Sequence, residues 1–174
     1  MTDERDDILV EMDEDMVLDA ETKKTSPFLM FSLGGEHYCV PVGQVKEVLR
    51  LAEVTRVPHT PEFVVGAANL RGEIVAILDI RHFFGLSERE NTQETMVVVT
   101  DVTGSAMGVI VDKLEGTIGI EDESIQAPLA TLKAELQKYT TGQLEKDGNI
   151  LILLDLERVL RCDEIESLKN GGQR

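Results

Sequence analysis

Short apolar runs separated by turn residues cover most of the chain after its first 26 positions. Two such runs within residues 28–40 are joined by Gly34-Gly35, and glycine tolerates the positive φ angles of a tight hairpin turn. The same arrangement recurs within residues 96–111. The runs are rich in Val, Ile and Leu, and β-branched side chains fit a pleated, half-buried surface. The pattern therefore predicts a mainly β fold in which each half opens with a hairpin.

Further strands and short helices are expected between and after these hairpins. Strands are predicted over 66–71 and 73–78, and Asp79 is placed to cap a short helix over 80–84. Residues 42–49 are ambiguous but fit a short helix, and the run that follows them, to Val57, fits a strand. The elements expected in the C-terminal part are strands over 114–120, a helix over 129–136, a hairpin over 139–154 and a final helix from Asp155.

Residues 72–84 and 148–160 carry the same pattern, 76 positions apart. Any turn, strand and capped helix would share part of this pattern, but the hairpin that opens each half favours a two-fold internal repeat. The repeat predicts two barrels of about five short strands each, which share a core because either alone would bury too little surface. We expect subdomains over 27–86 and 94–165. A closing strand and helix over 149–161 completes the second barrel or returns to the first.

The charge of the chain is strongly negative and unevenly distributed. The net charge is −16, and residues 1–22 hold ten acids and one base. We expect an acidic, disordered tail over 1–26 and a short tail over 166–174, joined to a less acidic body. A polyanion has no general affinity for nucleic acids or anionic membranes, because neutralising phosphates requires clustered Lys and Arg. Scarce aromatic residues also argue against a nucleic-acid-binding barrel.

The residues that most often support metal or nucleophilic chemistry are few. The three histidines and the two cysteines do not stand at the spacing of a metal site, a catalytic triad or a disulfide framework. They are His37, His59, His82, Cys39 and Cys162. We therefore expect no catalytic residue, no metal and no cofactor. The alternative is a hydrolase that uses carboxylates on a β-scaffold, and it requires a pocket with convergent, pKa-shifted acids.

No apolar run approaches the roughly 20 residues that a membrane-spanning helix needs. The N-terminus is acidic, whereas the start of a signal peptide is basic. These features predict a cytoplasmic location.

The segment from Gly66 to Gly72 is the most conspicuous polar interruption of the strand pattern. Gly66 permits a close backbone approach, Asn69 can bond its own loop, and Gly72 suits a positive φ angle. Arg71 presents a planar donor fork suited to carboxylates. Val45, Glu47 and Val48 are candidates for a mixed apolar and acidic patch nearby. From the residues alone, Arg71 fits a partner-binding surface and an internal pair with Glu47 or Asp79 equally well.

Residues 64–81 resemble the signature of the CheW family of chemotaxis coupling proteins, roughly G-x-x-N-L-R-G-x-I-x-P-I-x-D-L-R. The chain departs from that pattern at Ala76, where proline is usual, and at Ile80, where leucine is usual. The flanking hairpins and the closing strand and helix also resemble the family, although less specifically. The resemblance therefore covers about residues 28–165. The resemblance implies two SH3-like five-stranded β-barrels with short helices and no enzymatic activity.

The resemblance also implies partners, namely the cytoplasmic tips of methyl-accepting chemoreceptors and the regulatory domain of the histidine kinase CheA. Such a protein associates with membrane-bound receptor arrays through these partners alone. For receptor contact, the resemblance implies the positions Val45, Glu47, Gly66 and Arg71. Their neighbours Val48 and Asn69 are added to this set. Kinase contact is expected at barrel ends, where exposed edges can pair with another barrel, and the candidates are Gly108, Val109, Val111 and Asp112.

Two alternatives within the same class stay open. The chain can serve a chemosensory pathway other than flagellar motility, and the sequence does not decide which receptors it reads. A fused kinase or receiver relative is disfavoured, because a receiver alone would need about 100–150 further residues and only nine follow Ile165. A stand-alone adaptor is the preferred interpretation.

Overall fold

A computed structural model describes residues 23–51, 53–102 and 104–171 of the chain. Most of the acidic tail expected over 1–26 lies outside the described residues, although Thr25 and Ser26 already belong to the first strand. The tail expected over 166–174 begins instead inside a helix, Asp163–Gly171, in which Ile165 is buried.

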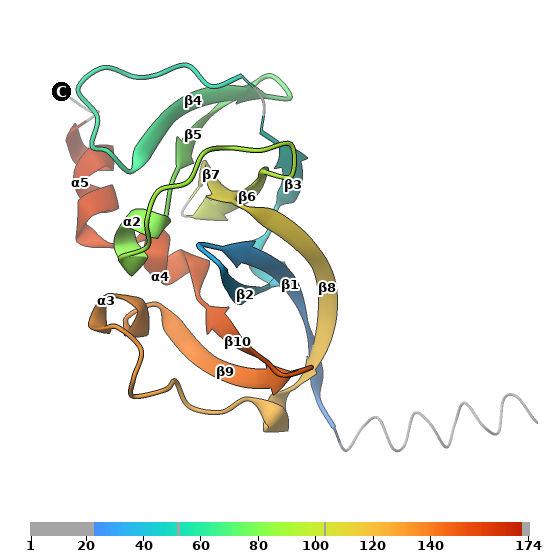
Figure 1. Ribbon diagram of the computed structural model, residues 1–174. Helices are drawn as coiled ribbons and strands as arrows, with labels where there is room; N and C mark the ends of the chain where they lie inside the picture. The colour runs from blue at the N-terminus through green and yellow to red at the C-terminus, as the bar shows by residue number, and fades with distance from the viewer. Residues whose placement is uncertain (1–22, 52, 103, 172–174) are drawn as a thin grey trace, which may run out of the picture.

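Strands dominate the described part of the chain, and the few helices are short (Figure 1). The strands are β1 Thr25–Leu33, β2 Glu36–Pro41, β3 Glu47–Arg50, β4 Val64–Leu70, β5 Glu73–Leu78, β6 Met96–Val102, β7 Ser105–Val111, β8 Lys113–Glu121, β9 Thr140–Lys146 and β10 Asn149–Leu154. The helices are α2 Arg81–Phe84, α3 Ala134–Gln137, α4 Leu156–Leu160 and α5 Asp163–Gly171, with 3-10 turns η1 Val42–Gln44 and η2 Asp122–Ser124. The predicted mainly β fold is confirmed.

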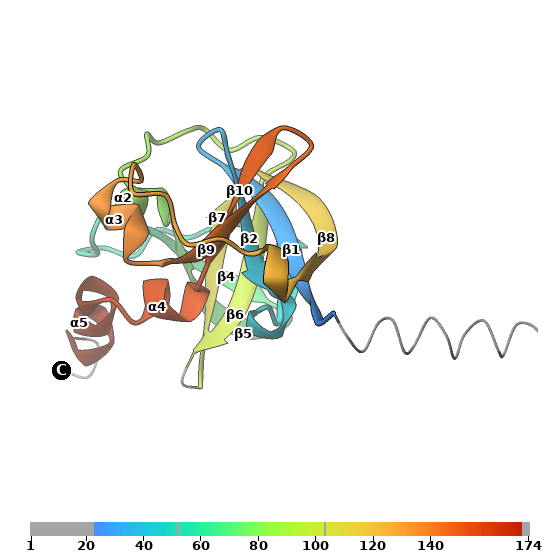
Figure 2. The ribbon, with the colours of Figure 1, turned by 90° about the horizontal axis from the view of Figure 1, so that it is seen from below.

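The strands form two five-stranded sheets. The first, called barrel A, has the order β8-β1-β2-β10-β9, and the second, called barrel B, has the order β3-β6-β7-β5-β4. Barrel B occupies the upper half of Figure 1 and barrel A the lower half. Figure 2 shows the helices gathered on the side of the molecule away from β1 and β8.

The internal repeat is present, but the two barrels are not consecutive in the chain. The hairpin β1–β2 pairs with β8 and β10 from the C-terminal half, and the hairpin β6–β7 pairs with β3 and β5 from the N-terminal half. The strands of the expected subdomains 27–86 and 94–165 are therefore shared between both barrels, and a division at the linker is wrong. The closing strand β10 returns to the N-terminal hairpin, where Ile152 pairs with Tyr38 in parallel. The physical reason is that two repeats with similar apolar faces can complete each other as well as themselves.

Each sheet closes through one isolated backbone bridge between its two edges. In barrel B, Thr55, which follows β3, exchanges hydrogen bonds of 2.8 Å with Ala67 in β4. In barrel A, Gln126, which follows β8, exchanges bonds of 2.8 and 2.9 Å with Gln143 in β9. These bridges leave no free edge on β4 at Ala67 or on β9 at Gln143, which is how barrels avoid exposed sheet edges.

A shared core joins the two barrels, as expected. The largest apolar cluster includes Phe31 and Tyr38 from barrel A together with Leu78 and Val109 from barrel B, and all four are buried. Smaller clusters fill each barrel separately, around Ile77 in barrel B and around Cys39, Ile120 and the β10 leucines in barrel A. The barrels therefore form one folding unit rather than two.

Two local predictions need correction. Residues 42–49 form a single 3-10 turn, η1, followed by strand β3 rather than a helix. The helix expected over 129–136 begins only at Ala134. The Gln137 side chain donates to the carbonyl oxygens of Ala130 (3.3 Å) and Leu132 (2.8 Å), so this segment satisfies backbone acceptors without helical hydrogen bonds.

Candidate partner-binding surface

The turn between β4 and β5 presents Arg71 at the end of barrel B. Leu70 pairs with Glu73, so Arg71 and Gly72 alone form the turn, with φ angles of 52° and 84°. Two successive positive φ angles are typical of the tight hairpin turns whose twist matches that of the strands. The Gly72 N–H donates to Asn69 Oδ1 at 2.9 Å. The expected local roles of Asn69 and Gly72 are confirmed, while Arg71 lies in the turn and not in the strand.

Two ion pairs fix this turn to the start of β3. Arg71 Nε lies 3.1 Å from Glu47 Oε2, and Lys46 Nζ lies 3.6 Å from Glu73 Oε2. The side chain of Arg71 is 75% exposed, whereas that of Glu47 is 24% exposed. The internal pair therefore forms with Glu47 and not with Asp79. The Glu47 contact uses Nε and the Arg71 side chain is mostly exposed, so the two terminal nitrogens remain able to bind a second carboxylate.

The other residues expected at this surface contribute little exposed area. Val45 and Val48 are half-buried and pack against the shared core. Gly66 is buried, and a Cβ atom there would lie 2.3 Å from the carbonyl oxygen of Thr55. Gly66 thus serves the closure of barrel B, and the exposed part of the surface narrows to Asn69, Arg71 and the edge of Glu47.

An exposed isoleucine beside the turn was not among the sequence candidates. Ile74 pairs with Asn69 across the hairpin and is 77% exposed, more than any other large apolar side chain in the described part of the chain. The signal was present in the alternation of β5, because Val75 and Ile77 point inward, so Ile74 must point outward. An exposed aliphatic side chain next to a charged pair is the composition expected of a small protein-binding surface.

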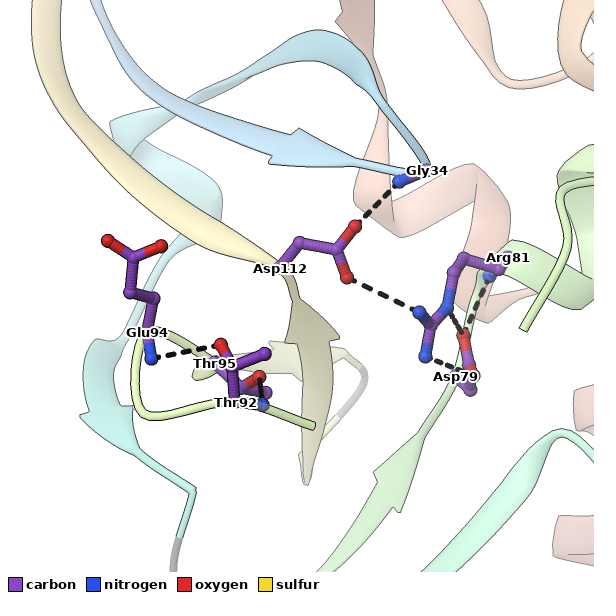
Figure 3. A network of polar contacts seen from close by, with 7 residues as sticks. All are labelled: Gly34, Asp79, Arg81, Thr92, Glu94, Thr95 and Asp112. Carbon is purple, nitrogen blue, oxygen red and sulfur yellow. Dashed lines mark hydrogen bonds and ion pairs between the residues drawn. The ribbon is translucent and has the colours of Figure 1, made fainter. Parts of the chain in front are cut away.

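A second polar cluster lies inside the molecule, at the end of the same signature (Figure 3). Arg81 is 3% exposed, and its Nε and Nη2 lie 2.9 and 2.8 Å from the two carboxylate oxygens of Asp79. Its Nη1 donates to Asp112 Oδ1 at 3.3 Å, and Asp112 Oδ2 accepts the Gly34 N–H at 2.8 Å. The hydrogen bond to Asp79 is the largest of the effects that raise the pKa of Arg81.

This cluster corrects the role predicted for Asp79. The carboxylate does accept the backbone N–H of Arg81 at 3.1 Å, but Ile80 is the N-cap residue of α2 and Asp79 mainly holds the Arg81 side chain. Asp155, its counterpart in the second repeat, is a true N-cap that accepts the N–H groups of Glu157 and Arg158. The Asp79–Arg81–Asp112 cluster instead joins α2, the β7–β8 corner and the β1–β2 turn, and so links the two barrels.

The candidates for kinase contact lie on β7, a central strand of barrel B, and at the corner that follows it. β7 is flanked by β6 and β5, so it offers no edge. Gly108, Val109 and Val111 are buried, and Asp112 is committed to Arg81 and Gly34. Burial leaves Val109 and Val111 no side-chain surface for a partner, so kinase contact through them stays a prediction that this geometry does not favour.

A cleft of about 700 Å³ lies where α4 and α5 face Lys138 and Tyr139. Three of its four acids contact the helices or neighbouring side chains: Asp155 caps α4, Glu157 lies 2.6 Å from Arg161, and Glu164 lies 3.5 Å from His82. Cations and anions alternate around it, which does not resemble the convergent acids that a hydrolase requires. Within the described residues no group of His, Cys, Asp and Glu is arranged to hold a metal ion. Nor does any helix in that part of the chain have the length and apolar character to cross a membrane.

Comparisons with known proteins agree with this architecture. The family model described as the CheW-like domain matches residues 27–164. The chemotaxis protein CheW of Klebsiella aerogenes is 32% identical over 143 residues, which cover 82% of this chain and 86% of that protein. The protein PilI of Pseudomonas aeruginosa is 29% identical over 122 residues, 70% of this chain and 68% of that protein. The crystal structure of the scaffolding protein TtCheW from Thermoanaerobacter tengcongensis superposes with a TM-score of 0.71 at 27% identity, covering 81% of this chain and 91% of that one. The chain therefore belongs to the CheW-like family of chemotaxis scaffold proteins.

Proposed function

We propose that this protein couples the cytoplasmic tips of chemoreceptors to the histidine kinase CheA, through protein–protein contacts alone, and that the β4–β5 turn reads the receptor. The observation that carries the proposal is the exposed, oriented Arg71, held at 3.1 Å by Glu47 beside the exposed Ile74. Family membership supports the role, since proteins similar to this chain over most of their length are named chemotaxis proteins or scaffolds.

The geometry suits a helical receptor tip that offers one acid and one apolar side chain. Glu47 holds the guanidinium of Arg71 in place, which lowers the entropy that would be lost when a receptor carboxylate binds its free nitrogens. Ile74 supplies apolar area that is already exposed and needs no rearrangement. A small apolar centre with a charged rim is enough for a specific and reversible contact.

For the kinase, we propose a contact at the opposite end of the molecule, on the β9–β10 turn of barrel A. Asp147 and Gly148 occupy the turn that corresponds to Arg71 and Gly72, with φ angles of 52° and 79°. Ile150 corresponds to Ile74 and is 46% exposed. The equivalent hairpin therefore presents an apolar residue beside an acid in place of a cation, so the two ends favour partners of different charge.

A second candidate is the same adaptor role in a chemosensory pathway other than flagellar motility. The similarity to PilI favours it, because this relative carries a different name from the chemotaxis proteins and is 29% identical to this chain over 122 residues. The same receptor-reading turn would serve either pathway.

The proposed receptor contact is tested with Arg71→Glu, and Lys138→Glu is the matched control because Lys138 is also an exposed cation, on the other barrel. Co-sedimentation with receptor-containing membranes and CheA is measured together with kinase activity. We expect Arg71→Glu to weaken receptor binding by about tenfold or more, the equivalent of roughly 1.4 kcal/mol, and Lys138→Glu to bind like the unchanged protein. Equal binding by both variants would show that the receptor is read elsewhere.

A further inference from the structure

Every strand pairing in the described structure falls into one of two classes. Residues 25–84 are termed repeat 1, and residues 96–160 are termed repeat 2. The hairpins β1–β2, β4–β5, β6–β7 and β9–β10 each lie within one repeat. The remaining ladders, β1–β8, β2–β10, β3–β6 and β5–β7, all join repeat 1 to repeat 2.

Neither barrel of the described structure is built from the strands of one repeat alone. In barrel A the β1–β2 hairpin of repeat 1 lies between β8 and β10 of repeat 2, and in barrel B the β6–β7 hairpin of repeat 2 lies between β3 and β5 of repeat 1. The core is divided in the same way, since Tyr38 and Leu78 of repeat 1 pack in one cluster with Val109 and Leu154 of repeat 2. The surface that each repeat must cover is complementary to the other repeat.

The covalent link between the repeats is an exposed segment. Residues 87–94 are exposed throughout, and they lie between Leu86, which is half-buried, and Thr95, which is buried. Thr95 anchors the end of the segment, because its Oγ1 accepts the Thr92 N–H at 2.8 Å. No strand ladder includes this segment, so a change in its course would break none of the pairings that hold the barrels.

We propose that a second copy of this chain can take the place of the covalently linked repeat, so that two copies exchange repeats and form a reciprocal dimer. Repeat 1 of each copy completes both barrels with repeat 2 of the other. Exchange preserves every ladder and the shared core, and domain swapping of this kind costs little because the contacts are those of the monomer. The linker decides the outcome, since it sets the effective concentration of one repeat near the other.

The dimer would retain the surface assigned above to the receptor. Glu47, Arg71 and Ile74 all lie in repeat 1, so exchange does not separate them. Each dimer would carry two complete copies of the β4–β5 turn and, if the proposed function holds, would bind receptors bivalently. The exchange itself rests only on the strand pairing and is tested without any receptor.

The first experiment shortens the linker in the full chain. Deletion of residues 88–91 removes four exposed residues that make no strand pairing, and the matched control inserts four Gly or Ser residues at the same place. A short hinge favours swapping and a long one relieves it. By sedimentation equilibrium we expect the deletion to raise the dimer fraction by about tenfold or more at equal concentration, while the insertion stays monomeric. A deletion variant that stays monomeric with unchanged unfolding stability would overturn the proposal.

The second experiment uses the unchanged chain and does not depend on a variant that folds. Two batches with different affinity tags are unfolded together in denaturant and refolded at high concentration; separately, the native batches are mixed at the same concentration. We expect dimers that carry both tags after refolding but not after native mixing, because exchange requires the ladders to open. Refolding to monomers alone, or mixed dimers formed equally from native protein, would contradict the exchange.

Discussion

Gly66 lies so close to the backbone of Thr55 that a Cβ atom at Gly66 would be 2.3 Å from the Thr55 carbonyl oxygen. Its counterpart in the second repeat, Gly142, is related in the same way to Gln126, with a Cβ-to-oxygen separation of 2.8 Å. Both glycines sit next to the bridge that closes their barrel. The first glycine of the family signature is therefore explained by barrel closure, and it needs no partner contact to account for it.

Gly66→Ala is expected to destabilise the protein because the new methyl group would separate β4 from the Thr55 segment. Gly66 also has a φ angle of 155°, which L-residues rarely adopt. Overpacking of this kind costs roughly 1–3 kcal/mol or more. Urea unfolding measures the effect, and Gly43→Ala is the control because nothing lies within 4 Å of a Cβ built there. Equal stability of the two variants would mean that the closure at Thr55 is not tight in solution.

Arg81 is the residue whose loss should most disturb the joint between the barrels. Arg81→Met keeps the length of the side chain but leaves Asp79 and Asp112 without the cation that both contact. Breaking a buried ion pair by removing one partner costs about 3–5 kcal/mol. Arg81→Lys should recover part of the loss, because lysine restores the charge but not the two-point contact with Asp79.

The measurement is the free energy of unfolding, with Arg89→Met as the control at an exposed arginine. Surface substitutions usually change stability by less than about 0.5 kcal/mol. If Arg81→Met and Arg89→Met unfolded at the same denaturant concentration, the Asp79–Arg81–Asp112 cluster would contribute nothing to the joint.

The sequence was sufficient for most of the elements and for the repeat, because both depend on local pattern. The Gly34-Gly35 hairpin and the turn at Gly72 could be predicted from glycine spacing and alternating apolar residues. The repeat could be predicted because residues 72–84 and 148–160 carry residues of the same type at matching positions. Pairing between repeats does not follow, since a strand with one apolar face fits either repeat and only the assembled core selects between them. The order of the strands in the sequence suggested one barrel per repeat, whereas each barrel combines strands from both repeats.

The candidate site was predictable in part for the same reason. Asn69, Arg71 and Gly72 act within one turn, so their local roles could be predicted from spacing. The burial of Gly66 and of the β7 candidates depends on segments distant in the chain. Arg81 was missed because a buried arginine looks like any polar helix residue until its partners Asp79 and Asp112 are placed around it.

Gln44 connects the repeats at a second point. Its side-chain amide donates to Asp155 Oδ1 at 2.8 Å and its Oε1 accepts the Leu156 N–H at 2.9 Å, so one residue of repeat 1 supports the start of α4 in repeat 2. Asp155→Ala should cost about 0.5–2 kcal/mol through loss of the N-cap. Together with Gln44→Ala in a double-mutant cycle, we expect a coupling energy of roughly 0.5–3 kcal/mol. Additive effects in urea unfolding would indicate that the amide does not act on the helix start.

The two cysteines are expected to differ strongly in reactivity. Burial, with a smaller contribution from Glu115, raises the pKa of Cys39 from 9.0 to about 12, and Cys39 has no exposed area. Burial also raises the pKa of Cys162, which is only half-buried. The thiolate is the reactive form, and a rise of three pKa units lowers its fraction about a thousandfold near neutral pH. Labelling of Cys39 in a Cys162→Ala variant should therefore require unfolding, whereas Cys162 in a Cys39→Ala variant should react in the folded protein.

The same shift predicts how stability responds to alkaline pH. The pKa of Cys39 is higher in the folded state than the ordinary value of 9.0, so the folded state holds this proton more tightly. The contribution of this thiol to the free energy of unfolding is therefore fully present below about pH 9. It falls as the pH rises toward about 12, because the thiol of the unfolded chain loses its proton at a lower pH and this favours the unfolded state. Burial raises the pKa of Tyr38 as well, so this hydroxyl also makes the folded state less stable at alkaline pH. Urea unfolding between pH 8 and 11 should show a steeper decline for the unchanged protein than for Cys39→Ala, and parallel declines would place the alkaline sensitivity elsewhere.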